Sequence, residues 1–336
     1  DYAASFVRWF AEEARRIDGD VLTSVKASQK LVVLKQPVCV TAAITPWNFP
    51  SAMIARKAAP ALAVGCAMII KPASLTPLSA YALALLAYEA GVPQDLLPVI
   101  SGHASEISHE FATNPTVHKI SFTGSTEVGA KIFADSAADI KKLSLELGGN
   151  APFIVFDDAN LDKAVEGALA SKFRNSGQTC VCTNRVYAQS GIYDEFCRKL
   201  SEKVAALKLG NGLDEGVNQG PLIEEKAVEK VEQHIADALA KGASCLTGGK
   251  RSALGGTFFE PTVLSGVTAQ MAVACEETFG PLCPVFRFET EAEVIEAANN
   301  TEYGLAAYLF TSDTARQSRR RSLGIRHGRH QYGLNQ

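Results

Sequence analysis

From residue 38 onward, the chain alternates short apolar runs with longer amphipathic segments. In the first half this pattern predicts strands at 38–44, 67–71, 97–100, 117–121 and 142–147, and helices at 51–62, 78–90, 104–112 and 126–137. A second alternation predicts strands at 153–156, 184–189 and 261–264, and helices at 161–174, 193–207, 224–239 and 291–299. Strands that alternate with helices of this length form parallel sheets covered on both faces. We therefore expect an α/β fold, with a Rossmann-type nucleotide-binding domain at 38–147 and a second α/β domain at 148–315.

The first 37 residues follow a different pattern. Phe6, Trp9 and Phe10 recur at helical spacing within residues 1–17, which predicts a helix whose aromatic stripe packs in the core. Residues 18–36 alternate and are rich in β-branched side chains, which predicts a hairpin or an extended arm. Because the sequence starts without Met and inside an amphipathic segment, we expect it to be a fragment of a longer protein.

The composition is that of an ordinary globular protein, with 336 residues of which 47% are hydrophobic and 21% charged. The net charge is -3 and no long basic run precedes the C-terminal tail, so neither a nucleic acid nor a membrane is expected as a partner. The longest apolar segment, at 58–70, contains Pro60 and Gly65 and is too short to span a bilayer. The eight scattered cysteines predict reduced thiols and a cytoplasmic location.

Residues 172–182 bring a glycine and two cysteines to the end of a predicted helix. Cys180 is a candidate nucleophile, which would need a local base or a positive field because a free thiol titrates near about 8.5. The alternative is that Cys180 and Cys182 are small buried residues, as most intracellular cysteines are. No second Cys or His pair stands at ligand spacing, so we expect no metal.

Several motifs decide between these alternatives. They are T-P-W-N-F-P (45–50), K-P-A-S (71–74), F-T-G-S-T-x-x-G (122–129), E-L-G-G (146–149), F-R-N-S-G-Q-T-C (173–180) and E-E-T-F-G-P (276–281). In this order they resemble the aldehyde dehydrogenase superfamily, over residues 1 to about 315. The V-C pair after Cys180 resembles the succinate-semialdehyde dehydrogenases of that superfamily. The resemblance implies oxidation of succinate semialdehyde to succinate with NAD(P), and glutarate semialdehyde or another aldehyde is the alternative substrate.

The resemblance also implies catalytic roles. Cys180 would attack the aldehyde, and Asn48 would donate to the resulting oxyanion together with the backbone N–H of Cys180. Glu146 would act as the general base that activates water. From the sequence alone, Asn48 could equally cap a helix, and Glu146 could be an ordinary surface carboxylate.

Cofactor binding is implied for eight residues: Thr45, Trp47, Lys71, Ser74, Gly124, Ser125, Glu277 and Phe279. The Gly124–Ser125 turn opens a predicted helix after a strand, where free backbone N–H groups can hold a phosphate. At the position of Ser74, family members that prefer NAD carry a glutamate, which repels a 2′-phosphate. Serine removes that repulsion, so we expect NADP to be preferred, with NAD also possible.

For the substrate, the resemblance implies that Arg56 and Arg174 bind the carboxylate of a semialdehyde. A guanidinium fork suits a carboxylate, although each arginine alone could be a surface ion-pair partner. The resemblance further implies a redox role for Cys182, as the partner of Cys180 in a disulfide. It also implies a homo-oligomer, a dimer of dimers, with residues 18–37 as the oligomerisation arm.

The resemblance stops after Thr314, where an Arg-rich stretch begins. We expect residues 316–336 to be read out of frame; a disordered basic tail or a nucleic-acid arm are the alternatives. Two other function classes remain open at this point. One is an inactive fragment or binding protein that retains the fold, and the other is a cysteine hydrolase that pairs Cys180 with one of the six histidines.

Overall fold

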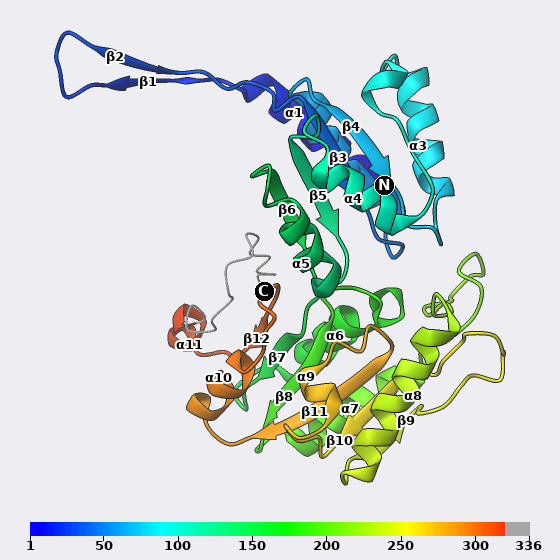
Figure 1. Cartoon of the computed structure of the whole chain (residues 1–336). Coiled ribbons are helices and arrows are strands. Elements are labelled where there is room, and N and C mark those ends of the chain that lie inside the picture. Colours follow the sequence, from blue (N-terminus) through cyan, green and yellow to red (C-terminus); the bar gives the residue numbers. More distant parts are fainter. Residues whose placement is uncertain (320–336) are drawn as a thin grey trace. The chain divides into compact units, whose positions relative to one another are not determined.

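The computed structural model describes residues 1–319 and divides into two compact units, Asp1–Leu147 and the part that begins at Gly148 (Figure 1). Each unit is built on its own mostly parallel sheet. The predicted α/β class is confirmed. The functional roles given to the sequence segments stay predictions.

The first unit is organised around a four-stranded parallel sheet with the order β4-β3-β5-β6. Its strands are β3 (Val40–Ile44), β4 (Ala67–Lys71), β5 (Lys119–Thr123) and β6 (Lys142–Glu146). Its helices are α1 (Tyr2–Glu13), α2 (Pro50–Ala63), α3 (Leu78–Glu89), α4 (Ala104–Thr113) and α5 (Thr126–Asp135). A two-stranded antiparallel hairpin, β1 (Asp20–Thr23) and β2 (Lys30–Val33), follows α1.

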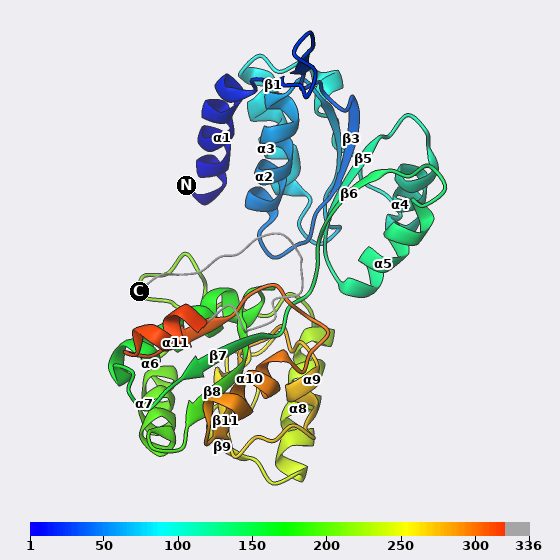
Figure 2. The ribbon, with the colours of Figure 1, turned by 90° about the vertical axis from the view of Figure 1, so that its left-hand side faces the viewer.

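Helices cover both faces of this sheet, and the alternation along β3 shows why (Figure 2). Ala43 packs with α2 and α3 in one buried cluster, whereas its neighbours Ala42 and Ile44 pack with α4 and α5 in another. Successive side chains of a strand point to opposite faces. A strand that is covered on both faces therefore reads as a continuous apolar run.

The second unit has a six-stranded sheet with the order β12-β7-β8-β11-β10-β9, in which only the edge strand β9 pairs antiparallel. The strands are β7 (Ala151–Val155), β8 (Thr183–Gln189), β9 (Ser244–Thr247), β10 (Thr262–Ser265), β11 (Leu282–Phe288) and β12 (Tyr308–Phe310). The helices are α6 (Leu161–Phe173), α7 (Tyr193–Ala205), α8 (Glu225–Ala240), α9 (Ala272–Cys275), α10 (Glu291–Asn299) and α11 (Thr314–Arg319). Helices α6 and α7 cover one face, and α8 and α10 contribute to the core on the other.

Several sequence predictions of strands are wrong. Residues 97–100 form no strand, because Pro98 has no N–H to donate and only Val99 bridges to Ile70. Strands β9, β11 and β12 were not predicted at all. β11 contains Pro284, β9 lies at a sheet edge with mostly exposed residues, and β12 is only three residues long.

The N-terminal segment departs from its prediction in a different way. The helix forms, but none of its residues is buried and Trp9 is 62% exposed, so the prediction of a core stripe is wrong for Trp9. The hairpin is confirmed, and every residue of its two strands is exposed. Its apolar side chains Val21, Leu31 and Val32 are among them.

Arg316 was predicted to begin the atypical tail but is anchored in the second unit. It lies in α11, pairs with Asp158 at 3.3 Å and with Glu291 at 3.2 Å, and stacks its guanidinium over the ring of Phe156 at 4.3 Å. Two ion pairs and a cation–π contact fix this side chain to the core of the unit. The rest of the predicted tail, residues 320–336, lies outside the described residues.

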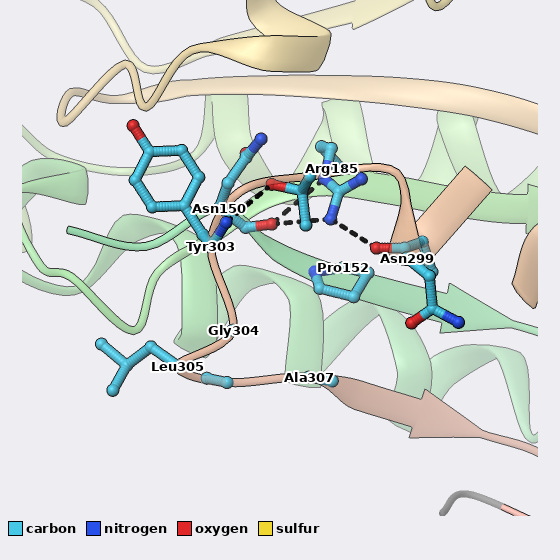
Figure 3. A pocket seen from close by; sticks show the side chains of 11 residues that line it. Asn150, Pro152, Arg185, Asn299, Tyr303, Gly304, Leu305 and Ala307 are labelled. Carbon is cyan, nitrogen blue, oxygen red and sulfur yellow. Dashed lines mark hydrogen bonds between the residues drawn. The ribbon is translucent and has the colours of Figure 1, made fainter. Parts of the chain in front are cut away.

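Arg185 joins β8 to Asn150 and to the carboxyl end of α10 (Figure 3). Its guanidinium is 1% exposed and donates to the carbonyl oxygens of Asn150, Ala297 and Ala298 at 2.9 to 3.1 Å. A small pocket beside it is lined by Tyr303 and Leu305 among others. A cation placed at the carboxyl end of α10 is favourable for the helix dipole as well as for the carbonyls.

Within residues 1–319 no helix has both the length and the apolar character needed to cross a membrane.

Candidate active site

The segment that carries Cys180 makes an unusual turn directly after α6. Asn175, Ser176 and Gly177 follow one another with φ of 51°, 54° and 75°. Left-handed backbone is uncommon for side-chain-bearing residues and costs about 1 kcal/mol or more for each. Side-chain amides stabilise the turn, because Asn175 donates to the Gln178 carbonyl at 3.3 Å and Gln178 donates back to the Asn175 carbonyl at 3.1 Å.

Gly177 is the one position of this turn that excludes any side chain. A Cβ added there would lie 2.1 Å from the carbonyl oxygen of Gly280. The amide oxygen of Gln178 accepts from the backbone N–H of Ile223 at 2.9 Å, and the Ser176 hydroxyl donates to the Gly220 carbonyl at 2.9 Å. The turn is therefore clamped from two sides before the chain reaches Cys180.

Cys180 itself is half-buried and is a free thiol. Its carbonyl oxygen lies against Gly149, where a Cβ would approach it to 2.0 Å. The next residue, Val181, has its carbonyl held by the Tyr308 hydroxyl at 2.7 Å. The second glycine of the E-L-G-G motif thus allows the backbone of the Cys180 loop to approach closely.

Cys182 differs from Cys180 in its surroundings. Its side chain is 1% exposed, and its thiol donates to the Lys172 carbonyl at 3.4 Å. Burial raises the pKa of the Cys182 thiol, with the nearby Lys172 ammonium acting in the opposite direction. Cys182 is a free thiol, so its predicted redox role stays a prediction.

Lys172 is a site residue that the sequence analysis did not find. It has no exposed surface, and its ammonium donates to the Asn184 side-chain oxygen at 3.0 Å. Burial lowers the pKa of Lys172, and the nearby Cys182, Cys283 and Glu277 oppose that shift. A lysine in an amphipathic helix usually lies at the surface, so the sequence carries no signal for this one.

The turn of the E-E-T-F-G-P motif lies in the same unit. One carboxylate oxygen of Glu277 accepts from the backbone N–H of Gly149 at 3.1 Å, and burial raises the pKa of Glu277 to about 7. Phe279 has a φ of 53°, again left-handed. Gly149 therefore touches two motifs, the Cys180 loop through its Cα and Glu277 through its N–H.

Arg174 begins the short 3-10 turn at the end of α6, and its side chain is exposed. Its carbonyl accepts from the Thr179 hydroxyl at 3.5 Å, within the loop 174–180 that leads to Cys180. Arg174, Cys180, Cys182 and Glu277 are thus assembled by the second unit alone. Phe279 also belongs to the second unit, and the remaining predicted site residues belong to the first.

In the first unit, most of the predicted residues lie at or shortly after the carboxyl ends of the strands, and Arg56 lies within α2. Asn48 precedes α2, but the N-cap residue of that helix is Phe49, so the alternative role of Asn48 as the helix cap is wrong. The Trp47 carbonyl accepts from the Thr76 hydroxyl at 3.4 Å. Thr45 follows β3 and donates its N–H to the Lys71 carbonyl at 3.2 Å.

Lys71, the last residue of β4, is 4% exposed, and burial lowers its pKa. Ser74 lies three positions later in an exposed turn. Ser125 is the N-cap of α5, and its hydroxyl accepts from the Val128 N–H at 3.4 Å. Gly124 donates its N–H to the Glu146 carbonyl at 3.0 Å, which joins the start of α5 to the end of β6.

Lys57 is the second site residue that the sequence analysis missed. It is 6% exposed and donates to the Ser121 hydroxyl at 2.8 Å. Burial lowers the pKa of Lys57 to about 7, and the half-buried Glu146 at the end of β6 opposes that shift. Its neighbour Arg56 is half-buried, with its guanidinium 5.4 Å from the centre of the Phe6 ring.

In the described part of the chain, no group of three or more His, Cys, Asp or Glu side chains is arranged to hold a metal ion.

Each of the two units is an α/β unit, and the second carries the strained Cys180 loop together with the Glu277 turn. Residues 1–325 match the model of the aldehyde dehydrogenase family, and the chain belongs to this family. The predicted resemblance is confirmed, and the match extends past its expected end near residue 315.

Among known proteins, the chain is 62% identical over 315 residues to the succinate-semialdehyde dehydrogenase [NADP(+)] GabD of Escherichia coli, a stretch that covers 94% of this chain and 65% of that relative. It is also 62% identical over 315 residues to a glutarate-semialdehyde dehydrogenase of Pseudomonas aeruginosa, with the same shares covered. The chain thus spans about two thirds of the length of these curated relatives.

The crystal structure of succinate-semialdehyde dehydrogenase from Burkholderia pseudomallei superposes with a TM-score of 0.94 at 61% identity. That alignment covers 95% of this chain and 66% of the other.

We predict that Gly177→Ala disrupts the nucleophile loop. The added methyl would meet the Gly280 carbonyl and would sit on left-handed backbone, so we expect a loss of roughly 2 to 4 kcal/mol in the free energy of unfolding of the second unit. Urea unfolding followed by circular dichroism measures this loss. Gly212→Ala, where an added Cβ meets no atom within 4 Å, is the matched control. Equal stability of the two variants would contradict the packing described for the loop.

A second prediction concerns pH. Because the folded pKa of Lys57 is about 7 and the ordinary pKa of a lysine is 10.5, the unfolded chain binds one more proton between these values. The free energy of unfolding should therefore rise with pH from about 7 to 10 through this group, by at most about 1.4 kcal/mol per pH unit. Below pH 7 Lys57 is protonated in both the folded and the unfolded chain, so its contribution to the free energy of unfolding no longer changes with pH.

Lys57→Met should remove this part of the slope and add a constant offset for the lost Ser121 hydrogen bond. Denaturant unfolding at several pH values measures it, with the exposed Lys131→Met on α5 as control. Parallel pH curves for the wild type and Lys57→Met would show that the ammonium is not desolvated.

Proposed function

We propose that this chain oxidises succinate semialdehyde to succinate, with NADP as the preferred hydride acceptor and NAD as a possible one. The observation that carries the proposal is the built nucleophile loop, in which Gly177 and Gly149 allow contacts that no other residue permits. The family membership and the 62% identity to an NADP-dependent succinate-semialdehyde dehydrogenase support it.

The strand ends of the first unit fit a dinucleotide. The hydroxyls of Thr45 and Thr123 are buried at the carboxyl ends of β3 and β5 and have no hydrogen-bond partner among residues 1–319. Ligands of parallel α/β sheets bind at such ends, and buried hydroxyls of this kind need a partner. The residues proposed to bind the cofactor are Thr45, Trp47, Lys71, Ser74, Gly124, Ser125, Glu277 and Phe279. When bound, it accepts the hydride that the substrate carbon loses.

The thiolate of Cys180 attacks the aldehyde carbon, and a thiohemiacetal oxyanion forms. The Asn48 amide and the Cys180 backbone N–H donate to this oxygen, and the loss of one such donor typically lowers the rate by about 10² to 10³-fold. After the oxidation step Cys180 carries a thioester. Glu146 takes a proton from water, the hydroxide attacks the thioester carbonyl, and the thiolate leaves as the acid is released.

Arg174 and Arg56 are proposed to bind the far carboxylate of the substrate. Arg174 lies on the nucleophile loop with its side chain exposed, so it is able to meet a ligand without leaving a core position. Arg56 is half-buried on α2, with its guanidinium over the Phe6 ring. Two guanidinium groups recognise a carboxylate in a planar, bidentate manner, which favours a semialdehyde over an uncharged aldehyde.

Glutarate semialdehyde is the second candidate substrate, because a relative with that activity is equally identical to this chain. The two substrates differ by one methylene, which is worth about 1 to 3 kcal/mol in a fitted pocket.

The exposed hairpin β1–β2 supports assembly with further copies of the chain. Its strands carry exposed valine and leucine side chains, and isolated two-stranded hairpins are marginally stable in water. We propose that it is an oligomerisation arm of a dimer of dimers. All eight cysteines are free thiols, as expected for a protein of a reducing compartment such as the cytoplasm.

Steady-state formation of NADPH tests the proposal. The chain should reduce NADP with succinate semialdehyde, and Cys180→Ala should abolish turnover. Arg174→Met should raise KM for succinate semialdehyde by about 10 to 100-fold, as expected for a lost charged hydrogen-bond pair, and change KM for an uncharged aldehyde of similar size much less. Full turnover by Cys180→Ala, or equal effects of Arg174→Met on charged and uncharged aldehydes, would contradict the proposal.

Ser74→Glu tests the cofactor preference separately. A carboxylate at this exposed position would repel the 2′-phosphate of NADP and would accept from the ribose hydroxyls of NAD. We expect the ratio of kcat/KM for NADP over NAD to fall by about tenfold or more. Ser74→Gln, which is nearly isosteric but neutral, is the control. An unchanged ratio in Ser74→Glu would show that this position does not face the nucleotide ribose.

A further inference from the structure

The turn 276–279 is held by two side chains of one helix. Lys230 and His234 stand four residues apart on α8, so they lie on the same face. The Lys230 ammonium donates to the Glu277 carbonyl at 2.6 Å. His234 contacts the residues on either side, with Nδ1 3.0 Å from the Thr278 hydroxyl and Nε2 3.2 Å from a Glu276 carboxylate oxygen.

The chemistry of these contacts assigns the proton on His234. A carboxylate only accepts hydrogen bonds, so Nε2 carries the proton toward Glu276 and Nδ1 accepts from the Thr278 hydroxyl. His234 is 4% exposed, and burial lowers its pKa, with the contact to Glu276 opposing that shift. The neutral ring is thus satisfied at both nitrogens.

The turn 276–279 needs this support because it follows a very short helix and contains a left-handed residue. The helix that precedes it, α9, has four residues, and Phe279 adopts left-handed φ. The Glu277 carboxylate nevertheless reaches the Gly149 N–H at 3.1 Å. A peptide held at both its carbonyl and its neighbouring side chains has little freedom to swing that carboxylate away.

We propose that Lys230 and His234 are positioning residues, which fix the direction of the Glu277 side chain and thereby set how tightly the chain binds its nicotinamide nucleotide. The effect on the nucleotide rests on the proposed function, in which Glu277 and Phe279 contact the cofactor. The effect on Glu277 and Gly149 does not. Lys230 also opposes the raised pKa of Glu277, so its ammonium favours the ionised carboxylate that accepts hydrogen bonds.

Two readouts test the inference on the whole chain. The first is hydrogen–deuterium exchange at the Gly149 amide, resolved to single residues by fragmentation in the mass spectrometer. The second is the dissociation constant for NADP, measured by titration calorimetry. The variants are Lys230→Met, Lys230→Arg and His234→Leu. Lys226→Met removes the same charge from an exposed position one turn earlier on α8 and serves as the matched control.

We expect Lys230→Met and His234→Leu to speed exchange at Gly149 and to weaken NADP binding, each by about tenfold, as for the loss of one hydrogen bond to or from a charged group. Lys230→Arg keeps a donor and should behave like the wild type, as should Lys226→Met. Circular dichroism checks that each variant is folded. Lys230→Met remains informative if His234→Leu does not fold, because Lys230 is only half-buried.

Unchanged exchange at Gly149 in folded Lys230→Met would overturn the inference, whatever the affinity for NADP. If the wild-type chain binds NADP, an unchanged NADP affinity in Lys230→Met and His234→Leu would also overturn the inference. Faster exchange in a chain whose wild type binds neither NADP nor NAD would support the positioning of Glu277. In that case the proposed cofactor role of Glu277 fails instead.

Discussion

The structure depends most on the close backbone approaches that glycine permits around the nucleophile loop. Gly177 lets the loop pass the Gly280 carbonyl, and Gly149 lets the E-L-G-G motif pass the Cys180 carbonyl. A side chain at either point would push apart segments that lie far apart in the sequence. These contacts join the Cys180 loop, the Glu277 turn and the first residues of the second unit.

The second unit therefore stores strain where its proposed chemistry occurs. Left-handed residues accumulate at 175–177 and recur at Phe279. The Ser176 hydroxyl donates to the Gly220 carbonyl, and Lys230 donates to the carbonyl of Glu277, two positions before Phe279. Such strain persists only where the surroundings over-determine the backbone. Two ionisable groups lie near the loop. Burial lowers the pKa of Lys172 and raises the pKa of the half-buried Glu277.

Much of this could be predicted from the sequence, and the failures have physical causes. Strands buried on both faces read as largely apolar runs, so the strands β3 and β7 were found. The strands β9 and β12 are short and carry no such signal, and Pro284 interrupts the apolar run of β11. Motif residues such as Cys180 and Glu277 were found by resemblance. Lys57 and Lys172 were missed because burial of a lysine depends on tertiary packing, and a helix pattern does not reveal it.

The most direct test of the account is to trap the covalent intermediate. Glu146→Gln removes the proposed base and should leave the thioester on Cys180 unhydrolysed when the chain is mixed with NADP and succinate semialdehyde. Peptide mapping by mass spectrometry should then find a succinyl group on Cys180, and none without NADP. A succinyl group on Cys182 or another cysteine, or an unmodified Cys180 in a variant that still forms NADPH, would contradict the assignment of Cys180 as the nucleophile.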